Sequence, residues 1–314
     1  MKPTAHRHHY LTQAYLAAFT DTGSKDGQFY VLDVNSGKCF RTSPKNVAIE
    51  RDFNRIDVEG KPPDALEQAL SPFEERMAQA CRNVNCIKTF PSEEDCNYII
   101  NLLGLIAIRN PQFRYSFNRA REKSMRIIDH MLMSDKKIFE HHLKKAKEAG
   151  YLEKNTKISF EEMKRLDEQG YEIEFMPEGN VRIEFRLFDE LLPVLGKRTW
   201  SLLIAPDPGP GFICSDHPVT LSWKKMHGGP IGYGLKNTEV FFPLGPRTGF
   251  WGVYENPLSE TFMLNVHQVA IMNCRVVLNA ERHVFSPVDK FLISYKGKEI
   301  ELDCGSMLQA GSSR

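Results

Sequence analysis

Helical and strand patterns occupy different stretches of this chain, and that separation limits the possible fold more than any other feature. Apolar residues recur at intervals of three and four between residue 64 and about residue 150. Beyond residue 170, short apolar runs alternate with loops that are rich in Pro and Gly. Helices in one stretch and strands in another are typical of α+β proteins. We therefore predict an α+β fold with a mainly antiparallel sheet, a helical lobe in the first half and a C-terminal helix.

Capping residues and apolar spacing delimit the predicted helices. Ser92 and Ser159 each precede an acidic residue by three positions, which is the pattern of a capping box. Pro111 interrupts the helical pattern that opens at Ser92, and the pattern then resumes. The predicted helices cover residues 9–20, 64–80, 92–110, 111–133 and 135–150, a segment that opens at Ser159, and residues 259–279.

Strand propensity and turn residues indicate two β-hairpins. The first joins residues 29–34 to residues 38–41 through a turn that contains Gly37. The second joins residues 171–175 to residues 181–185. Further strands are predicted at residues 200–204, 212–215, 219–223, 240–242, 250–254 and 284–285.

The two patterns follow each other without a flexible linker, and no internal repeat is visible. We therefore predict one α+β domain over residues 1–304, with its helical lobe at about residues 64–170. Residues 305–314 are mostly polar and are predicted to form a flexible tail.

The composition excludes several classes of protein. Lys and Arg number 41 against 40 Asp and Glu, so no global field selects nucleic acid or membrane. A run of about 18 apolar residues, which a transmembrane helix needs, does not occur. The N-terminal residues lead into histidines instead of a signal region, and the seven cysteines form no C-x-x-C pair. We expect a cytoplasmic protein with reduced, mostly buried thiols and no Cys-rich zinc site.

The predicted helices from Arg109 to Gly150 carry a local excess of positive charge. They contain eleven Lys or Arg against five Asp or Glu, with Phe113, Tyr115 and Phe117 interleaved. Such a stretch is able to follow a phosphate backbone, so nucleic acid or a nucleotide is a candidate partner. The alternative is a solvated helical face with ion pairs four residues apart, such as Glu140 with Lys144.

His9 opens the first predicted helix, and Gln13 lies one turn later on the same face. A histidine titrates near neutral pH, so His9 is a candidate general base or metal ligand. The alternative is a polar pair that caps the helix or satisfies buried backbone groups. His6 and His8 are expected to be solvated.

Carboxylates recur in the next part of the chain. Glu50 and Asp52 are two positions apart, so in an extended segment they share a face and are able to bind one cation. Glu67 and Glu74 are seven apart and lie on one side of a helix, where carboxylates near a histidine often bind metals. In the alternative reading, all four are ordinary solvated charges.

Asp216 follows a predicted buried strand and precedes the turn imposed by Pro218. A rigid strand aims such a side chain into a cleft, which makes Asp216 a candidate catalytic acid. Alternatively, Asp216 caps the turn by accepting hydrogen bonds from backbone amides.

Several of these segments resemble an uncharacterised family of mostly bacterial proteins, the domain-of-unknown-function family numbered 4238. Thr12 stands where that family favours Pro, and His217 stands where it has Asn. The matching segments are residues 9–16, 30–33, 43–53, 215–219 and 279–285, together with Asn273. The resemblance implies that six polar positions belong together, namely His9, Gln13, Glu50, Asp216, Asn279 and Arg282.

Short motifs exclude the easily named enzymes, since the chain has no G-x-S-x-G, P-loop or H-E-x-x-H sequence. We expect a metal-dependent hydrolase that acts on phosphodiesters, such as a nuclease. Carboxylates would hold Mg²⁺ or Mn²⁺, His9 would activate water, and an arginine would stabilise developing charge. The predicted catalytic residues are His9, Gln13, Asp216 and Arg282, the metal ligands are Glu50, Glu74 and Asp216, and the substrate-binding residues are Arg109 and Asn279.

Two other functions fit the same residues. In one, the protein is a non-enzymatic module that binds a ligand or a protein, and the polar residues form a buried network between helix and sheet. In the other, the basic helices bind RNA or a nucleotide. The hydrolase hypothesis predicts that Asp216→Ala folds normally and loses activity.

Overall fold

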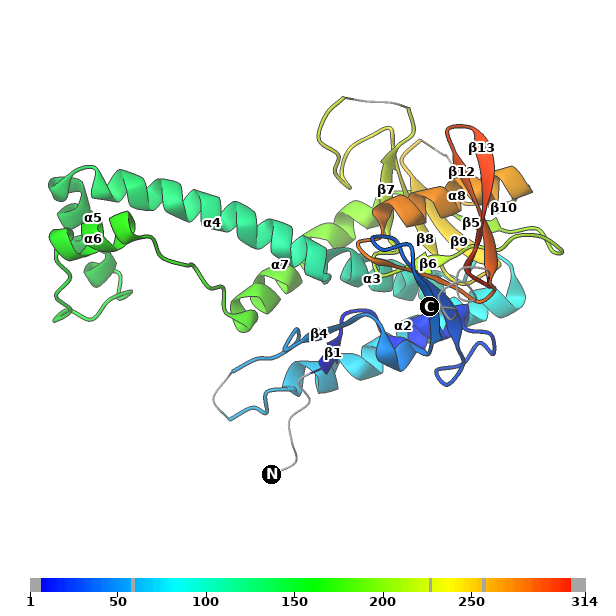
Figure 1. Ribbon diagram of the computed structural model, residues 1–314, viewed down its shortest axis with the longest axis horizontal. Helices are drawn as coiled ribbons and strands as arrows, with labels where there is room; N and C mark the ends of the chain where they lie inside the picture. The colour runs from blue at the N-terminus through cyan, green and yellow to red at the C-terminus, as the bar shows by residue number, and fades with distance from the viewer. Residues whose placement is uncertain (1–6, 58–59, 226–227, 256–257, 306–314) are drawn as a thin grey trace. The chain divides into compact units, whose positions relative to one another are not determined.

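The computed structural model describes residues 7–57, 60–225, 228–255 and 258–305. The chain forms two compact units, of which unit 1 comprises Met1–Pro111 and Pro177–Arg314, and unit 2 comprises Gln112–Met176 (Figure 1). Unit 1 combines helices with mostly antiparallel sheets, whereas the described part of unit 2 is helical. This arrangement confirms the predicted α+β class.

A five-stranded sheet forms one layer of unit 1, in the order β10-β5-β9-β8-β7. Neighbouring strands are antiparallel except β10 and β5, which are parallel. The predicted strands of this region are confirmed to within two residues at each end. Their observed bounds are Thr199–Ile204 (β5), Thr220–Trp223 (β7), Thr238–Pro243 (β8) and Thr248–Val253 (β9), while β10 (Thr261–Met263) was not predicted as a strand.

Helix α8 (Val266–Asn279) covers the five-stranded sheet (Figure 1). Val269 and Val276 of α8 belong to the same buried cluster as Leu203 of β5 and Phe241 of β8. The helix begins later than the predicted 259–279 because residues 261–263 pair with β5 as a strand. Asn265 then starts the helix with a capping box.

A four-stranded sheet joins the two ends of the chain, in the order β3-β2-β11-β6. The predicted hairpin is present as β2 (Phe29–Asp33) and β3 (Cys39–Thr42). Strand β11 (His283–Ser286) lies between β2 and β6 (Cys214–Ser215), so it pairs with both. The predicted short strand at residues 284–285 is therefore a central strand of this sheet.

Two helices of unit 1 begin within one residue of their predicted starts, and the first of them continues seven residues beyond its predicted end. Helix α2 spans Ala65–Ile87, and α3 spans Glu93–Ile108 after Ser92, whose hydroxyl accepts the backbone N–H of Asp95. Helix α3 packs against α2 and α7 (Pro177–Gly196). It comes so close to α7 that a Cβ at Gly104 would lie 3.3 Å from side-chain atoms of α7.

The predicted second hairpin is wrong, because residues 181–185 lie in α7 and not in a strand. Val181, Ile183 and Phe185 alternate with polar residues, which indicates a strand over this short window. Over the whole segment, the buried residues Val181, Glu184, Leu191 and Leu195 follow helical spacing.

The N-terminal prediction is also wrong in part, because His9 lies in a strand. Strand β1 (Arg7–His9) pairs with β4 (Ile49–Arg51), and the helix α1 covers only Gln13–Leu16. Thr12 caps α1 by accepting the N–H of Ala14. His9 and Gln13 therefore do not share a helical face.

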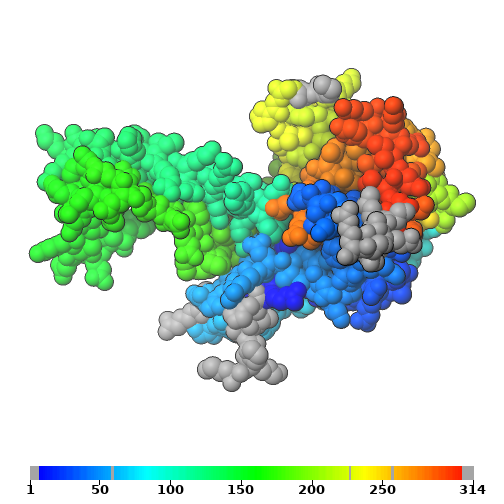
Figure 2. All heavy atoms as spheres, in the orientation of Figure 1, coloured from blue at the N-terminus to red at the C-terminus, as the bar shows by residue number. Residues whose placement is uncertain are grey.

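A hairpin near the C-terminus was not predicted. It consists of β12 (Lys290–Tyr295) and β13 (Lys298–Asp303), and β12 packs against α8. Figure 2 shows this hairpin in red at the surface of unit 1, beside the orange α8. The predicted flexible tail falls almost entirely on residues 306–314, which lie outside the described residues.

Unit 2 contains the basic helices α4 (Pro111–Met133) and α5 (Lys136–Glu148), together with the acidic helix α6 (Phe160–Gln169). The predicted capping box at Ser159 is present, and Asp135 caps α5. Phe139 and Phe160 pack edge to face, with ring centroids 5.6 Å apart. In the described part of the chain, no helix has both the length and the apolar character needed to cross a membrane.

Candidate functional site

A polar cavity of about 560 Å³ opens in unit 1 beside β1, β4 and the start of β11. Its lining includes three arginines and three carboxylates, together with Tyr10 and His283. We call this cavity the polar pocket. The six charged residues are Arg7, Arg51, Arg282, Glu50, Asp216 and Glu281.

Asp216 holds the segment that supplies Glu281, Arg282 and His283 to the polar pocket. Its Oδ1 accepts the backbone N–H of Glu281 at 3.0 Å, and its Oδ2 accepts those of Arg282 and His283 at 2.8 Å each. The carboxylate is 5% exposed. Hydrogen bonds to an ionised acceptor are stronger than those to a neutral one, so Asp216 fixes the backbone of residues 281–283.

Asn279 connects the same two segments through hydrogen bonds that run from the end of α8 to the loop after β6. Its Nδ2 donates to the carbonyl oxygens of His217 at 2.7 Å and Val219 at 3.0 Å. The end of α8 and the loop after β6 are therefore tied together by one side chain from each. Both Asp216 and Asn279 use their polar atoms on backbone groups, while their predicted roles in catalysis and substrate binding stay predictions.

Burial shifts the pKa of the two titratable side chains that flank Arg282 in opposite directions. It raises the pKa of the Glu281 carboxyl, and the nearby charge of Asp216 adds to this effect. It lowers the pKa of His283, against the opposing influence of Asp216. The pocket thus places a carboxyl biased toward its neutral form two residues from an imidazole biased toward its neutral form.

Arg282 and Tyr10 complete the chemistry of the pocket. The Arg282 side chain is 64% exposed, and its Nε lies 2.9 Å from Oδ2 of Asp33. That hydrogen bond holds the pKa of the Asp33 carboxyl far below its usual range. Burial raises the pKa of Tyr10, and the acids Asp216, Glu281 and Glu50 raise it further, so its hydroxyl stays a hydrogen-bond donor.

A second polar group, which we call the buried network, lies among β1, α2, α3 and α7. At its centre, Asn54 donates its backbone N–H to Nδ1 of His8 at 2.9 Å and its Nδ2 to Glu67 at 2.5 Å. Arg109 donates to Oδ1 of Asn54 at 2.5 Å, and its Nε lies 3.8 Å from Glu184. Asn54, Arg109 and Glu184 are at most 4% exposed.

The buried network changes the interpretation of several predicted residues. His8 is 2% exposed, so the prediction that it is solvated is wrong. His6 lies outside the described residues. Arg109, predicted to bind substrate, is sealed inside the network with a side-chain exposure of 5%.

Glu74 and His9 lie near the buried network and do not line the polar pocket. Burial raises the pKa of Glu74, while the charge of Arg109 opposes that shift. Burial lowers the pKa of His9, and Glu67 opposes it. The two residues thus share Glu67 of α2 as a charged neighbour. Gln13, the remaining predicted catalytic residue, is the first residue of α1.

The predicted metal ligands are divided between the two polar groups. Glu50 and Asp216 line the polar pocket, whereas Glu74 lies near Arg109. Asp52 adopts a left-handed conformation with φ of 55°, so it does not continue the extended segment of Glu50 as predicted. Among the described residues, no three His, Cys, Asp or Glu side chains are grouped to hold a metal ion.

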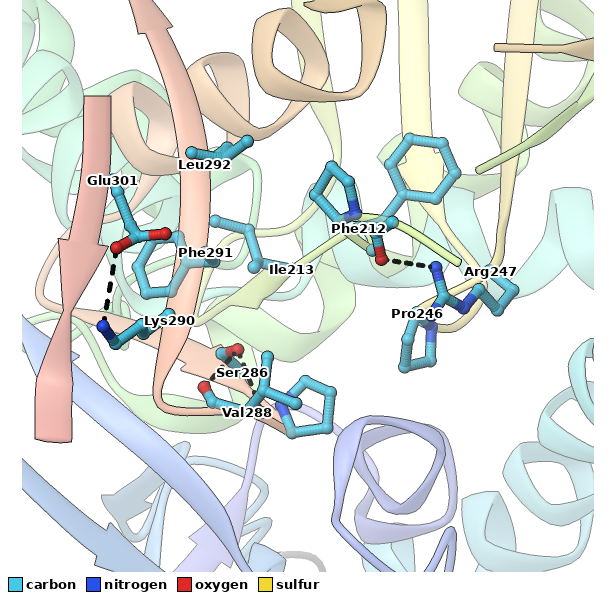
Figure 3. A pocket seen from close by; sticks show the side chains of 14 residues that line it. Phe212, Ile213, Pro246, Arg247, Ser286, Val288, Lys290, Phe291, Leu292 and Glu301 are labelled. Carbon is cyan, nitrogen blue, oxygen red and sulfur yellow. Dashed lines mark hydrogen bonds and ion pairs between the residues drawn. The ribbon is translucent and has the colours of Figure 1, made fainter. Parts of the chain in front are cut away.

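Figure 3 shows another cavity of unit 1, of about 330 Å³, between the β12–β13 hairpin and the loop around Gly211. Its charged side chains have partners of their own. Lys290 lies 3.6 Å from Glu301, and Arg247 donates to the carbonyl oxygens of Pro206 and Gly209. We therefore interpret this cavity as a gap between packed loops, whose charged side chains already bind one another or backbone groups.

The fold and the polar pocket together define an α+β protein with a charged cavity braced from two distant parts of the chain. Over residues 7–289, the sequence matches the family model described as protein of unknown function (DUF4238). The chain belongs to this family, which confirms the resemblance seen in its motifs. No curated protein matches the sequence, and no solved structure matches it.

Sequence reasoning missed the residues that become important only in three dimensions. Tyr10, Glu281 and His283 line the polar pocket, and each directly adjoins or lies within a segment that the family resemblance marks. Asn54 and Glu184 are 130 positions apart in the chain, and no local pattern connects them. One signal in the sequence was available, because an acid in the apolar stripe of a helix, such as Glu184, indicates a buried charge that needs a partner.

Acid sensitivity follows from the buried histidines of unit 1. Burial lowers the pKa of His9, His217 and His283. Above about pH 6.5 these imidazoles are neutral in both the folded and the unfolded states. As the pH falls below that value, the unfolded chain binds protons that the folded chain does not, so the free energy of unfolding decreases. We expect urea unfolding to show lower stability at about pH 5.5 than at about pH 7.5.

The contribution of His217 is separable by substitution. His217→Asn removes one buried imidazole whose pKa is lowered, so the loss of stability on acidification should be smaller. His267→Asn alters an exposed histidine of α8 and serves as the control. Equal acid sensitivity of both variants and the unchanged protein would contradict the role given to His217.

Proposed function

We propose that the protein is a hydrolase that acts on phosphodiesters in the polar pocket. The observation that carries this proposal is the segment 281–283, whose backbone is fixed by Asp216 and whose side chains line the cavity. Burial favours the neutral forms of both titratable groups, namely a carboxyl that is able to donate a proton and an imidazole that is able to accept one. Arginines beside them are suited to a phosphate group, because a guanidinium binds its oxygens in a bidentate manner.

Each side chain has a distinct part in the proposed reaction. Arg7 and Arg282 bind the phosphate oxygens and stabilise the charge that develops on them. His283, kept neutral by burial, takes a proton from the attacking water. Glu281, whose pKa is raised, gives a proton to the leaving oxygen. In this scheme Asp216 is a positioning residue, since it holds the backbone of both groups.

The proposal assigns no step to a metal ion. The prediction of Mg²⁺ or Mn²⁺ stays open to a direct test, because hydrolysis that is lost on addition of EDTA and restored by either ion would establish it. We place the activity in the cytoplasm, in keeping with seven cysteines that are all free.

The test uses bis(p-nitrophenyl) phosphate as substrate and follows release of nitrophenolate. His283→Gln is expected to lower kcat by about 100-fold or more, because it removes the base that activates water. Glu281→Gln should lower kcat by about 100-fold or more on a dinucleotide, whose alkoxide leaving group needs a proton, and by less on the nitrophenyl substrate, whose nitrophenolate leaves without one. The matched controls are Glu299→Gln and His267→Gln, which alter an exposed ion pair elsewhere in unit 1. Turnover that is unchanged in both pocket variants would exclude the proposed acid and base.

A second function is favoured by an observation in unit 2. A surface cavity of about 420 Å³ is lined there by Lys144, Lys147 and Lys154 together with Glu140 and Glu148, so lysines outnumber acids in its lining. Closely spaced lysines attract phosphate groups, so unit 2 is a candidate site for RNA or a nucleotide. Salt-sensitive RNA binding that is lost on replacement of Lys144 and Lys145 by Gln, and is indifferent to Glu281→Gln, would favour this binding module over the hydrolase.

A further inference from the structure

A third cavity of unit 1, of about 500 Å³, lies between α8 and the edge of the five-stranded sheet that ends in β10. We call it the apolar pocket. Its volume falls within the range of small-molecule binding sites. The residues that carry the argument are Leu203, Trp251, Phe262, Ile271, Met272 and Arg275.

The walls of the apolar pocket are large apolar side chains from both layers. Leu203 and Trp251 come from neighbouring strands of the sheet, while Ile271 and Met272 come from α8. The rings of Trp251 and Phe262 pack edge to face, with centroids 6.3 Å apart. Apolar and aromatic walls of this kind favour a ligand with an apolar body.

One end of the apolar pocket is charged. Arg275 lines the cavity, and its Nη2 lies 2.6 Å from Oε1 of Glu239. Glu239 is 6% exposed, and its other oxygen accepts the indole N–H of Trp251 at 2.8 Å. Both carboxylate oxygens are therefore engaged, whereas a guanidinium carries five N–H donors. The Arg275 side chain is 25% exposed, so it is positioned to bind a second acceptor from the cavity.

We propose that the apolar pocket binds a small carboxylate with an apolar body, and that Arg275 binds the carboxylate group. The charge that faces the cavity is positive, because Arg275 belongs to the lining and Glu239 lies behind it. An arginine anchored by a buried acid keeps its planar group in place, which favours a planar anionic acceptor. This site is separate from the polar pocket, and it does not depend on the function proposed there.

The test uses anilinonaphthalene sulfonate as a fluorescent probe, since it combines an apolar aromatic body with one anionic group. The full chain is expected to increase the fluorescence of the probe, and naphthoate or decanoate is expected to displace it. The corresponding alcohols, which lack the charge, should displace it at least about tenfold more weakly. The two carboxylates distinguish an aromatic body from an acyl chain.

Variants locate the probe in the cavity. Ile271→Glu places a negative charge in the wall and should abolish binding of both probe and carboxylate. The paired change of Arg275→Gln with Glu239→Gln avoids leaving a buried charge alone, and it should erase the preference for carboxylates over alcohols. Arg186→Gln, on the surface of α7, is the control. Probe binding that survives Ile271→Glu, or a carboxylate preference that survives the paired change, would overturn the proposal.

Discussion

Replacement of Asp216 by Ala is expected to lower the free energy of unfolding by about 3–5 kcal/mol, because three backbone N–H groups lose their shared, buried carboxylate acceptor together. The structure thus leads to an expectation opposite to that of the sequence, in which Asp216→Ala folds normally. Asp216→Asn keeps one acceptor oxygen and should lose less, about 1–3 kcal/mol. Urea unfolding followed by circular dichroism measures both changes.

Asp207→Ala provides the matched control for this prediction. Asp207 is 61% exposed and takes part only in loose ion pairs, at 3.5 Å to Arg247 and 3.9 Å to Lys88, as far as the described contacts show. Its removal should change stability by no more than about 0.5 kcal/mol. If Asp216→Ala proved as stable as Asp207→Ala, the Asp216 carboxylate would have to be assigned a catalytic role instead of a structural one.

Replacement of Glu184 by Ala is expected to destabilise unit 1 by about 3–5 kcal/mol, since it removes a buried carboxylate that balances the buried guanidinium of Arg109. The two side chains are 3% and 5% exposed, so water does not compensate for the lost charge. Urea unfolding of the variant measures the effect. The exposed Glu190 on the same helix, which pairs with Arg186, is the control, and Glu190→Ala should cost less than about 1 kcal/mol.

A double variant separates the charge from the packing. Arg109→Met combined with Glu184→Leu removes both charges and keeps apolar volume, so it should be more stable than Glu184→Ala alone. A double variant that is less stable than the single variant would show that the ion pair itself stabilises the fold.

Local sequence signals predicted those elements in which the turn or capping residues and the apolar spacing indicate the same structure. The β2–β3 hairpin has a glycine in its turn, and α3 and α6 start at Ser92 and Ser159, whose hydroxyls accept the expected backbone N–H groups. The prediction for α7 was wrong because the alternating polarity of a five-residue window was given more weight than the helical spacing of the whole segment. Pro177 at its first position is the start signal that the longer window would have used.

The candidate site was predicted as a set of residues and not as an arrangement. The family resemblance brought Glu50, Asp216 and Arg282 together, and all three line the polar pocket. No local pattern indicated that both carboxylate oxygens of Asp216 accept hydrogen bonds from backbone groups about 65 positions further along the chain. Partners so distant in sequence are specified by the tertiary fold, which a single sequence does not display.

The central place of β11 in the four-stranded sheet has a consequence for biosynthesis. Its partners are β2, near the start of the chain, and β6, so hydrogen bonds of this sheet join residues 32 and 284. During translation, β2 has no neighbour on that side until synthesis has reached β11. Such non-local pairing folds slowly, and an unpaired strand edge attracts other chains. Nascent chains that stall before residue 283 are therefore expected to depend on chaperones, and to be degraded if they are not protected.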